Sequence, residues 1–239
     1  MALPGVYKIF NDNWAKHTVW LYSDPHFSDE ELQLNVTNRP DDETQIKMIN
    51  SQVGKNDTFI CLGDVGNIEY IRKIKGYKVL IMGNHDTGKT NYERKIEYKK
   101  YPKDSYSREE IIKTMKNLYP NWKINIREEH GFHAPFEWWE VEIDNCLFDE
   151  VYEGALIIGE KIILSHEPVN IPWMWNFHGH DHTGNFRENH LNVCSDVIGY
   201  KPINLNTFLK HYGISSKIQS IHRVTIDNAT KRKQRKKKN

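Results

Sequence analysis

Five short polar groups in this sequence carry side chains suited to metal and phosphate chemistry. They are Asp24-Pro25-His26, Gly63-Asp64, Gly83-Asn84-His85-Asp86, His166 and Gly179-His180-Asp181-His182. Carboxylates, imidazoles and amide oxygens bind divalent metals such as manganese, iron, zinc, nickel or cobalt. The groups therefore predict a metal centre. Because none of them contains a cysteine, this centre is not expected to be a structural zinc site.

The spacing within two of the groups favours convergence of their side chains. In a D-x-H or H-x-H step on an extended backbone, the first and third side chains point to the same face. Asp24 can therefore meet His26, and His180 can meet His182. Glycine at the start of a group allows the backbone to turn sharply there.

Apolar, β-favouring runs lead into the polar groups and predict the strands that position them. Helical patterns lie between the runs, one of them with acidic residues in its first turn. Strands separated by helices form a parallel sheet, in which ligands bind beyond the carboxyl ends of the strands. The predicted strands are 18–22, 58–62, 77–82 and 161–164, and the predicted helices are 40–53 and 68–74.

Segment 87–133 is rich in lysine and tyrosine and is interpreted as an insertion over the site, with an amphipathic helix around 107–118. Its tyrosines could stack on bases, as in proteins that bind single strands, but packing of an added helix is the favoured explanation. These tyrosines are Tyr92, Tyr98, Tyr101 and Tyr106. Further predicted elements are strands at 136–143, 191–194 and 224–226 and a helix at 205–211.

The length of 239 residues predicts one domain over residues 1–227, followed by a basic tail at 228–239 that we expect to be disordered. Residues 231–239 hold seven of the 33 basic residues, which leaves 26 basic against 32 acidic residues elsewhere. A body with this balance cannot attract nucleic acid through its overall charge. A solvated terminus is the favoured interpretation of the tail.

Nothing in the sequence indicates a membrane segment or a disulfide framework. No apolar run is long enough to cross a bilayer, and the first residues lack the layout of a signal peptide. Cys61, Cys146 and Cys194 are far apart and form no C-x-x-C pair. We expect a cytoplasmic protein with no membrane partner and with ordinary buried thiols.

Taken in order, the polar groups resemble the motif series D-x-H, G-D, G-N-H-[DE], H and G-H-x-H of the calcineurin-like metallophosphoesterases. The segments 38–40, 164–168 and 201–202 are similar to those of compact bacterial and phage-type members. The resemblance implies a four-layer α/β/β/α sandwich of two mixed sheets flanked by helices. It also implies an enzyme that hydrolyses a phosphomonoester or phosphodiester through a metal-bridging hydroxide.

The resemblance also implies a role for each residue of the motifs. One metal would be held by Asp24, His26 and His182, the other by Asn84, His166 and His180, with Asp64 bridging the two ions. Manganese is the expected metal, with iron, zinc, nickel or cobalt as alternatives.

Three further residues complete the expected site. His85 would protonate the leaving group or stabilise the charge that builds on phosphorus, and Asp86 could orient its imidazole. Arg39 is a candidate phosphate clamp because a guanidinium fits phosphate in a bidentate manner, but a surface salt bridge explains it equally well.

Other functions fit parts of the sequence. A nuclease could grip DNA or RNA through the tail and the insertion, and a non-catalytic module could use the same fold for protein interactions. Residues 83–90 also satisfy the G-x-x-x-x-G-K-[ST] pattern of P-loop nucleotide hydrolases. The substrate is expected to be a phosphate ester, with nucleotides and nucleic acids among the candidates. A Ser/Thr protein phosphatase is disfavoured, because that branch has G-D-x-V-D-R-G where this chain reads Gly63-Asp64-Val65-Gly66-Asn67, without the second aspartate and the arginine.

Overall fold

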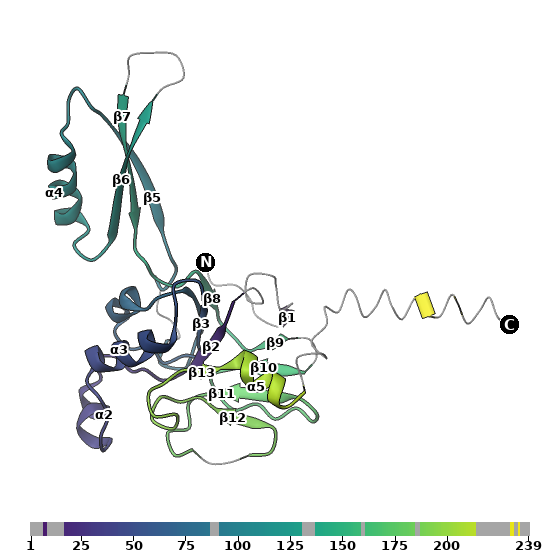
Figure 1. Cartoon of the computed structure of the whole chain (residues 1–239). Coiled ribbons are helices and arrows are strands. Elements are labelled where there is room, and N and C mark those ends of the chain that lie inside the picture. Colours follow the sequence, from purple (N-terminus) through teal and green to yellow (C-terminus); the bar gives the residue numbers. More distant parts are fainter. Residues whose placement is uncertain are drawn as a thin grey trace.

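A computed structural model describes residues 7–8, 17–86, 91–130, 137–158, 161–184, 187–213, 230, 231 and 234. Its body contains two five-stranded sheets, and a three-stranded sheet projects from that body (Figure 1). The mixed α/β class predicted from the sequence is therefore confirmed.

The first sheet has the strand order β13-β2-β3-β4-β8. Four of its strands are parallel, namely β2 (Val19–Tyr22), β3 (Thr58–Cys61), β4 (Tyr77–Ile81) and β8 (Glu150–Tyr152). The edge strand β13 (Ile203–Asn204) is antiparallel to β2. The apolar runs at 18–22, 58–62 and 77–82 thus form neighbouring strands, as predicted, and their carboxyl ends lie at one edge.

Helices cover one face of this sheet. Helix α3 (Asp42–Gln52) starts after Asp41, whose side chain accepts a hydrogen bond from the Thr44 amide, and it buries Ile46 and Ile49. The predicted second helix is a 3-10 helix, η1 (Ile68–Lys73). A short helix, α2 (Glu30–Asn35), was not predicted; it buries none of its residues, so it leaves no apolar periodicity in the sequence.

The second sheet has the order β1-β9-β10-β11-β12. Its strands are β1 (Tyr7–Lys8), β9 (Leu156–Ile158), β10 (Ile162–Leu164), β11 (Trp175–His178) and β12 (His190–Asn192). Side chains of both sheets share one apolar core, including Leu21, Ile60, Leu164 and Phe177. Helix α5 (Leu205–His211) adds Leu205 and Leu209 to it. Since β10, β11 and β12 are parallel, their carboxyl ends also point one way.

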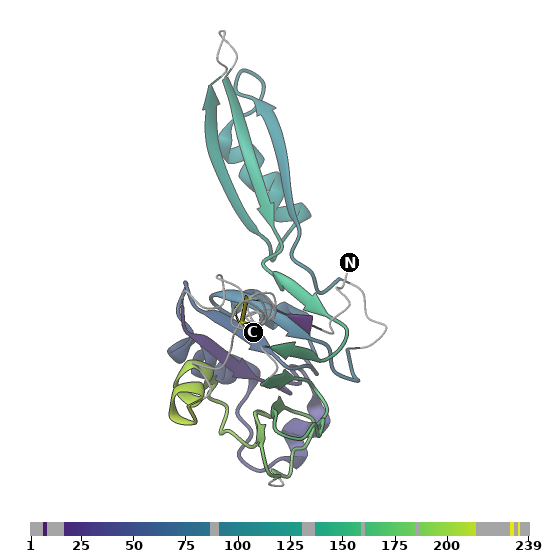
Figure 2. The ribbon, with the colours of Figure 1, turned by 90° about the vertical axis from the view of Figure 1, so that its right-hand side faces the viewer.

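The projecting unit is an antiparallel sheet of order β5-β7-β6 with one helix packed on it (Figure 2). The elements are β5 (Ile96–Pro102), α4 (Arg108–Leu118), β6 (Lys123–His130) and β7 (Glu137–Asp144). It has its own core, formed by Ile111, Met115, Val141 and Ile143. Because β7 pairs with both other strands, the inserted segment continues to Asp144 and does not end near residue 133, where the sequence suggested.

Several remaining predictions can be placed. The helices expected at 107–118 and 205–211 are confirmed, and the strand expected at 191–194 is found at His190–Asn192. The strand expected at 224–226 and nearly all of the tail at 228–239 lie outside the described residues. Among the described helices, none is long and apolar enough to cross a membrane.

Candidate metal centre

The seven predicted metal ligands come together where five strands end. Asp24 and His26 follow β2, Asp64 follows β3, and Asn84 follows β4. From the second sheet, His166 follows β10, and His180 and His182 follow β11. Asp64 belongs to two candidate ligand groups, one with His166 and His180 and one with Asp24 and His26, and Asp24 also lies close to His182 and Cys194.

The first group surrounds Nε2 of His166. This nitrogen lies 2.9 Å from Asn84 Oδ1, 3.2 Å from His180 Nδ1 and 3.3 Å from Asp64 Oδ2. Nδ1 of His166 lies 2.8 Å from the carbonyl oxygen of Leu62, which fixes the ring. Nε2 of His166 carries at most one hydrogen and cannot donate a hydrogen bond to all three neighbouring atoms. Their convergence is therefore explained by a cation that all four atoms could bind.

The second group contains Asp24, His26 and His182. Asp24 Oδ1 lies 3.9 Å from His26 Nε2 and 3.8 Å from His182 Nε2, and Asp64 Oδ2 lies 3.6 Å from His26 Nε2. His26 Nε2 is buried and has no hydrogen-bond partner among the described residues. A buried nitrogen without a partner is costly, and a metal ion would supply the missing interaction.

The loops achieve this convergence through a left-handed backbone. The φ angles are 55° at Asp24, 42° at His26, 53° at Asp64 and 65° at His180. The expected extended D-x-H and H-x-H steps were therefore wrong: the side chains meet because the loops turn. Such conformations cost about 1–2 kcal/mol for each residue with a Cβ atom, so neighbouring contacts must hold them.

Gly83 and Gly179 leave no room for a Cβ atom. A Cβ atom on Gly83 would collide with Asp64 Oδ1, and one on Gly179 would collide with Asp24 Oδ2. Both glycines therefore allow a backbone to approach a carboxylate of the site closely.

Asp86 holds two of the loops together. Its Oδ2 accepts hydrogen bonds from the amides of Asp64 (2.7 Å) and Gly83 (2.9 Å), and its Oδ1 from the Val65 amide (3.1 Å) and the Tyr92 hydroxyl (3.0 Å). The residue is fully buried. The suggestion that Asp86 orients the imidazole of His85 is therefore wrong, because its oxygens are engaged with backbone amides and Tyr92.

Asp196 was missed in the sequence, although it contacts a predicted ligand. Its Oδ2 accepts a hydrogen bond of 2.6 Å from Nδ1 of His182, and its Oδ1 one of 2.6 Å from the hydroxyl of Tyr200. This bond turns Nε2 of His182 toward Asp24, an arrangement typical of metal-ligating histidines. No local pattern marks Asp196, because it meets His182 only through the fold.

Arg39 supports the same carboxylate. Its Nη1 lies 2.6 and 2.8 Å from the two oxygens of Asp196, and its Nη2 donates to the carbonyl oxygen of Pro25 at 2.6 Å. The side chain is completely buried. The phosphate-clamp prediction does not fit this position, because the guanidinium faces Asp196 and backbone carbonyls. The alternative, a salt bridge, is found, but it is buried and not on the surface.

Charge and burial shift the pKa values of these groups. The hydrogen bond to Asp196 raises the pKa of His182. Burial alone would raise the pKa of Asp196, but its bonds to His182 and Tyr200 and the charge of Arg39 lower it to about 2. Without metal, this ion pair stabilises the fold most between about pH 4 and 6.5, since it is lost when Asp196 is protonated below or His182 deprotonated above.

The pKa values of two other histidines of the site are shifted in opposite directions. Burial lowers the pKa of His26. Burial also opposes the protonation of His166, but its hydrogen bond to Asp64 and the charges of Asp24 and Asp64 outweigh burial and raise its pKa.

Cys194 also lies beside the second group, with Sγ 3.5 Å from His182 Nδ1. Burial raises the pKa of this thiol well above its ordinary value. Because Sγ faces Nδ1 of His182, the nitrogen bonded to Asp196, and not the Nε2 that faces Asp24, we interpret Cys194 as a packing residue.

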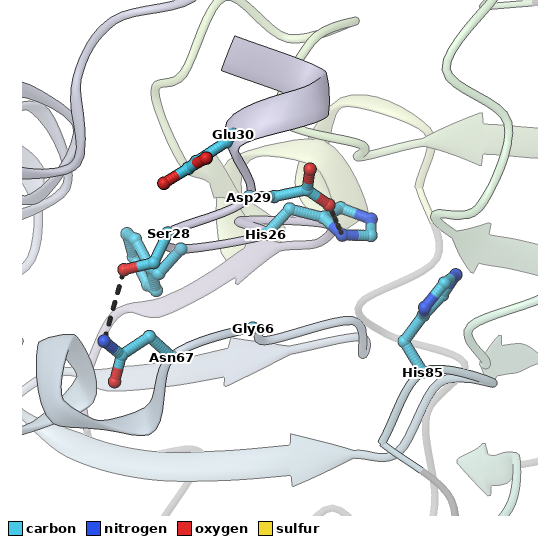
Figure 3. Close-up of a pocket in the computed structure, with 8 residues that line it drawn as sticks. His26, Ser28, Asp29, Glu30, Gly66, Asn67 and His85 are labelled. Atoms are coloured by element: carbon cyan, nitrogen blue, oxygen red, sulfur yellow. Dashed lines mark hydrogen bonds and ion pairs between the residues drawn. The ribbon is translucent and has the colours of Figure 1, made fainter.

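His85 borders a cavity beside the centre. The cavity has a volume of about 530 Å³ and is lined by His26, Phe27, Ser28, Asp29, Glu30, Gly66, Asn67 and His85 (Figure 3). The amide of His85 donates to Asp64 Oδ1 at 2.9 Å, while the residue itself is exposed. Its imidazole can therefore reach a molecule bound next to the candidate metal ligands.

The comparison with known families identifies the class of protein. Residues 17–187, well over half of the chain, match the model described as calcineurin-like phosphoesterase. The chain therefore belongs to the calcineurin-like phosphoesterase family. Together with the ligand groups around Asp64, the family supports a metal-dependent phosphoesterase.

The comparisons with solved structures and with curated proteins add no information on function. A crystal structure of a protein of unknown function from Aquifex aeolicus is similar to this chain with a TM-score of 0.48 and 21% identity, over 81% of this chain and 98% of that one. No curated protein matches significantly.

The P-loop interpretation of residues 83–90 is wrong. Residues 87–90 lie outside the described part, but from Asn91 the chain continues through a bridge between Glu93 and Phe148 into strand β5. A P-loop is followed by a helix whose N-terminus faces the phosphates.

We expect Asp86→Ala to destabilise the metal-free protein by at least about 3 kcal/mol, because three buried amides lose their acceptor. Tyr92→Phe removes only one of the four hydrogen bonds and should cost about 1 kcal/mol. Urea denaturation with chelator present measures both, and equal losses would contradict the role of Asp86.

Manganese affinity should fall as the pH decreases from 8 toward 6. The raised pKa values of His166 and His182 make protons compete with the metal, by up to about tenfold per pH unit for each proton displaced. Calorimetry in two buffers of different ionisation enthalpy should detect proton release on binding. Affinity independent of pH over this range would contradict the assignment.

Proposed function

We propose that this protein hydrolyses a phosphomonoester or phosphodiester with two divalent metal ions, manganese being the activating ion in vitro. The observation that carries the proposal is the position of Asp64, which belongs to both ligand groups and lies beside the cavity bordered by His85. A pair of metal sites that share one carboxylate is a common arrangement for phosphoryl transfer.

In this proposal, Asp24, His26 and His182 hold one ion, and Asn84, His166 and His180 hold the other. Two bound cations would polarise the phosphoryl oxygens and lower the pKa of an attacking water. Further hydrogen bonds hold the ligands in place. His182 is bonded to Asp196, His166 to the carbonyl oxygen of Leu62, and the amide of His180 donates to Asp24.

His85 is proposed as the proton donor to the leaving group. Its backbone amide is tied to Asp64, and its ring stands edge-on to His26 with the ring centres 5.4 Å apart. The imidazole therefore has a fixed relation to the ligands but lies on the exposed side of the centre, where the departing oxygen would be.

The contacts of the insertion favour packing over nucleic-acid binding. Tyr92 is buried against Asp86, and Tyr101 packs in the core of the insertion, so neither can stack on a base. Lys100 pairs with Glu129, and Arg127 with Glu140, across the strands. These pairs neutralise two basic residues of the insertion, while Tyr98 and Tyr106 remain exposed.

We expect Asp64→Asn to reduce manganese-dependent hydrolysis of p-nitrophenyl phosphate and bis-p-nitrophenyl phosphate to background, because the shared charge between the ions is lost. Asp181→Asn is the matched control: this carboxylate lies between two ligands, but its Oδ1 accepts from the Thr183 amide at 2.9 Å. The control should keep most of its activity. Full activity of Asp64→Asn would disprove the proposed mechanism.

His85→Ala should lower kcat by about 10²-fold or more for alkyl phosphate esters. The loss should be smaller for p-nitrophenyl esters, since p-nitrophenolate leaves without a proton. Manganese affinity should not change. Equal losses for both kinds of ester would show that His85 is not the proton donor.

A further inference from the structure

The cavity beside His85 has a strongly one-sided charge. Among its lining residues are two carboxylates, Asp29 and Glu30, and none of the lining residues is a lysine or an arginine. A volume of about 530 Å³ lies within the range of pockets that hold small molecules. Its position is also specific, because it is bounded by His26, whose buried Nε2 lacks a partner, and by His85.

Figure 3 shows how these side chains are arranged: His85 lies at one end, Ser28, Glu30 and Asn67 lie toward the other, and His26 and Asp29 lie between them. A phosphate held at the metal centre would thus have its leaving oxygen near His85. The rest of the leaving alcohol would extend toward Glu30.

The acidic wall is held in place by its own contacts. Asp29 Oδ1 accepts from the Leu32 amide at 3.0 Å, and its Oδ2 lies 3.5 Å from Nδ1 of His26. Asn67 donates to the hydroxyl of Ser28 at 3.2 Å. The wall therefore needs little reorganisation to receive a ligand.

Glu30 differs from these residues. It is exposed, and it makes no hydrogen bond or ion pair within the part of the chain that the structure describes. Its charge is therefore available to a ligand in the cavity, and that charge repels a second phosphate or a carboxylate.

We propose that this cavity binds the alcohol part of the substrate and selects esters whose alcohol carries an ammonium group over esters whose alcohol carries a second anionic group. This proposal rests on the proposed function, because the cavity has this role only if phosphate is bound at the metal centre. It assigns a small cationic phosphate ester as the substrate class and disfavours polyphosphates and nucleic-acid strands in this cavity.

Three monoesters of similar size test the proposal with the manganese-loaded protein: phosphoethanolamine, propyl phosphate and phosphoglycolate. We expect kcat/KM to fall in that order, by about fivefold at each change of charge, and the differences to shrink at high salt. Equal values, or the reverse order, would overturn the proposal.

Glu30→Gln should reduce the preference for phosphoethanolamine over phosphoglycolate by about threefold, with the effect mainly in KM. Glu31→Gln is the matched control, because Glu31 is the neighbouring exposed glutamate in α2 but does not line the cavity. A similar change in both variants would overturn the specific role of Glu30.

Binding separates this proposal from the proposed function. Calorimetric titration of manganese-loaded His85→Ala with the three monoesters measures their affinities with turnover slowed about 10²-fold. The same order of affinities supports the subsite even if no ester is hydrolysed, an outcome that would count against the proposed function alone. Binding of phosphoglycolate as tight as that of phosphoethanolamine overturns the subsite even if hydrolysis is found.

Discussion

The carboxylate of Asp86 fastens the loops after β3 and β4, and the site depends on that connection. Its oxygens accept hydrogen bonds from the amides of Asp64, Val65 and Gly83, which lie in the loops after two neighbouring strands of the first sheet. A charged acceptor of this kind is stronger than a neutral one, and here it is entirely buried. The position of the shared ligand Asp64 relative to Asn84 and His85 is thereby set before any metal binds.

The loops around Asp86 contain strained backbone conformations and close contacts. Asp24, His26, Asp64 and His180 all adopt a left-handed backbone, and Gly83 and Gly179 bring the main chain against carboxylates. Hydrogen bonds between the loops offset this cost, including those from the amides of Asp24 to Gly63 and of His26 to Asp64, each 3.0 Å. The gathering of carboxylates and imidazoles in a buried space is itself unfavourable without a cation, so the fold and the metal site are physically linked.

Much of the fold follows from the sequence because buried parallel strands are continuous apolar runs. The runs that became β2, β3 and β4 are of this kind, and each leads directly into a ligand loop. Strands β5 and β6 were not predicted, because β5 consists mostly of partly or fully exposed lysine and tyrosine residues, and in β6 only Ile124 and Ile126 mark the face that packs on the core of the projecting unit. Asp196 and Arg39 form an internal pair from distant positions, and only the three-dimensional arrangement shows that they support His182. The left-handed ligand positions are equally hidden, since aspartate and histidine, although enriched in that backbone conformation, adopt it in only a minority of cases.

The projecting unit between β4 and β8 has a consequence for how the chain could be shortened. These two strands are neighbours and run parallel, so the chain must return from the end of one to the start of the other. Parallel neighbours always need a crossover of a dozen or more residues, usually a helix. Residues 82–95 and 145–149 already exceed that length, and Ile96 lies opposite Asp144 where the unit begins and ends. A minimal version of this protein could therefore join the two ends of the unit by a turn and keep the crossover from β4 to β8.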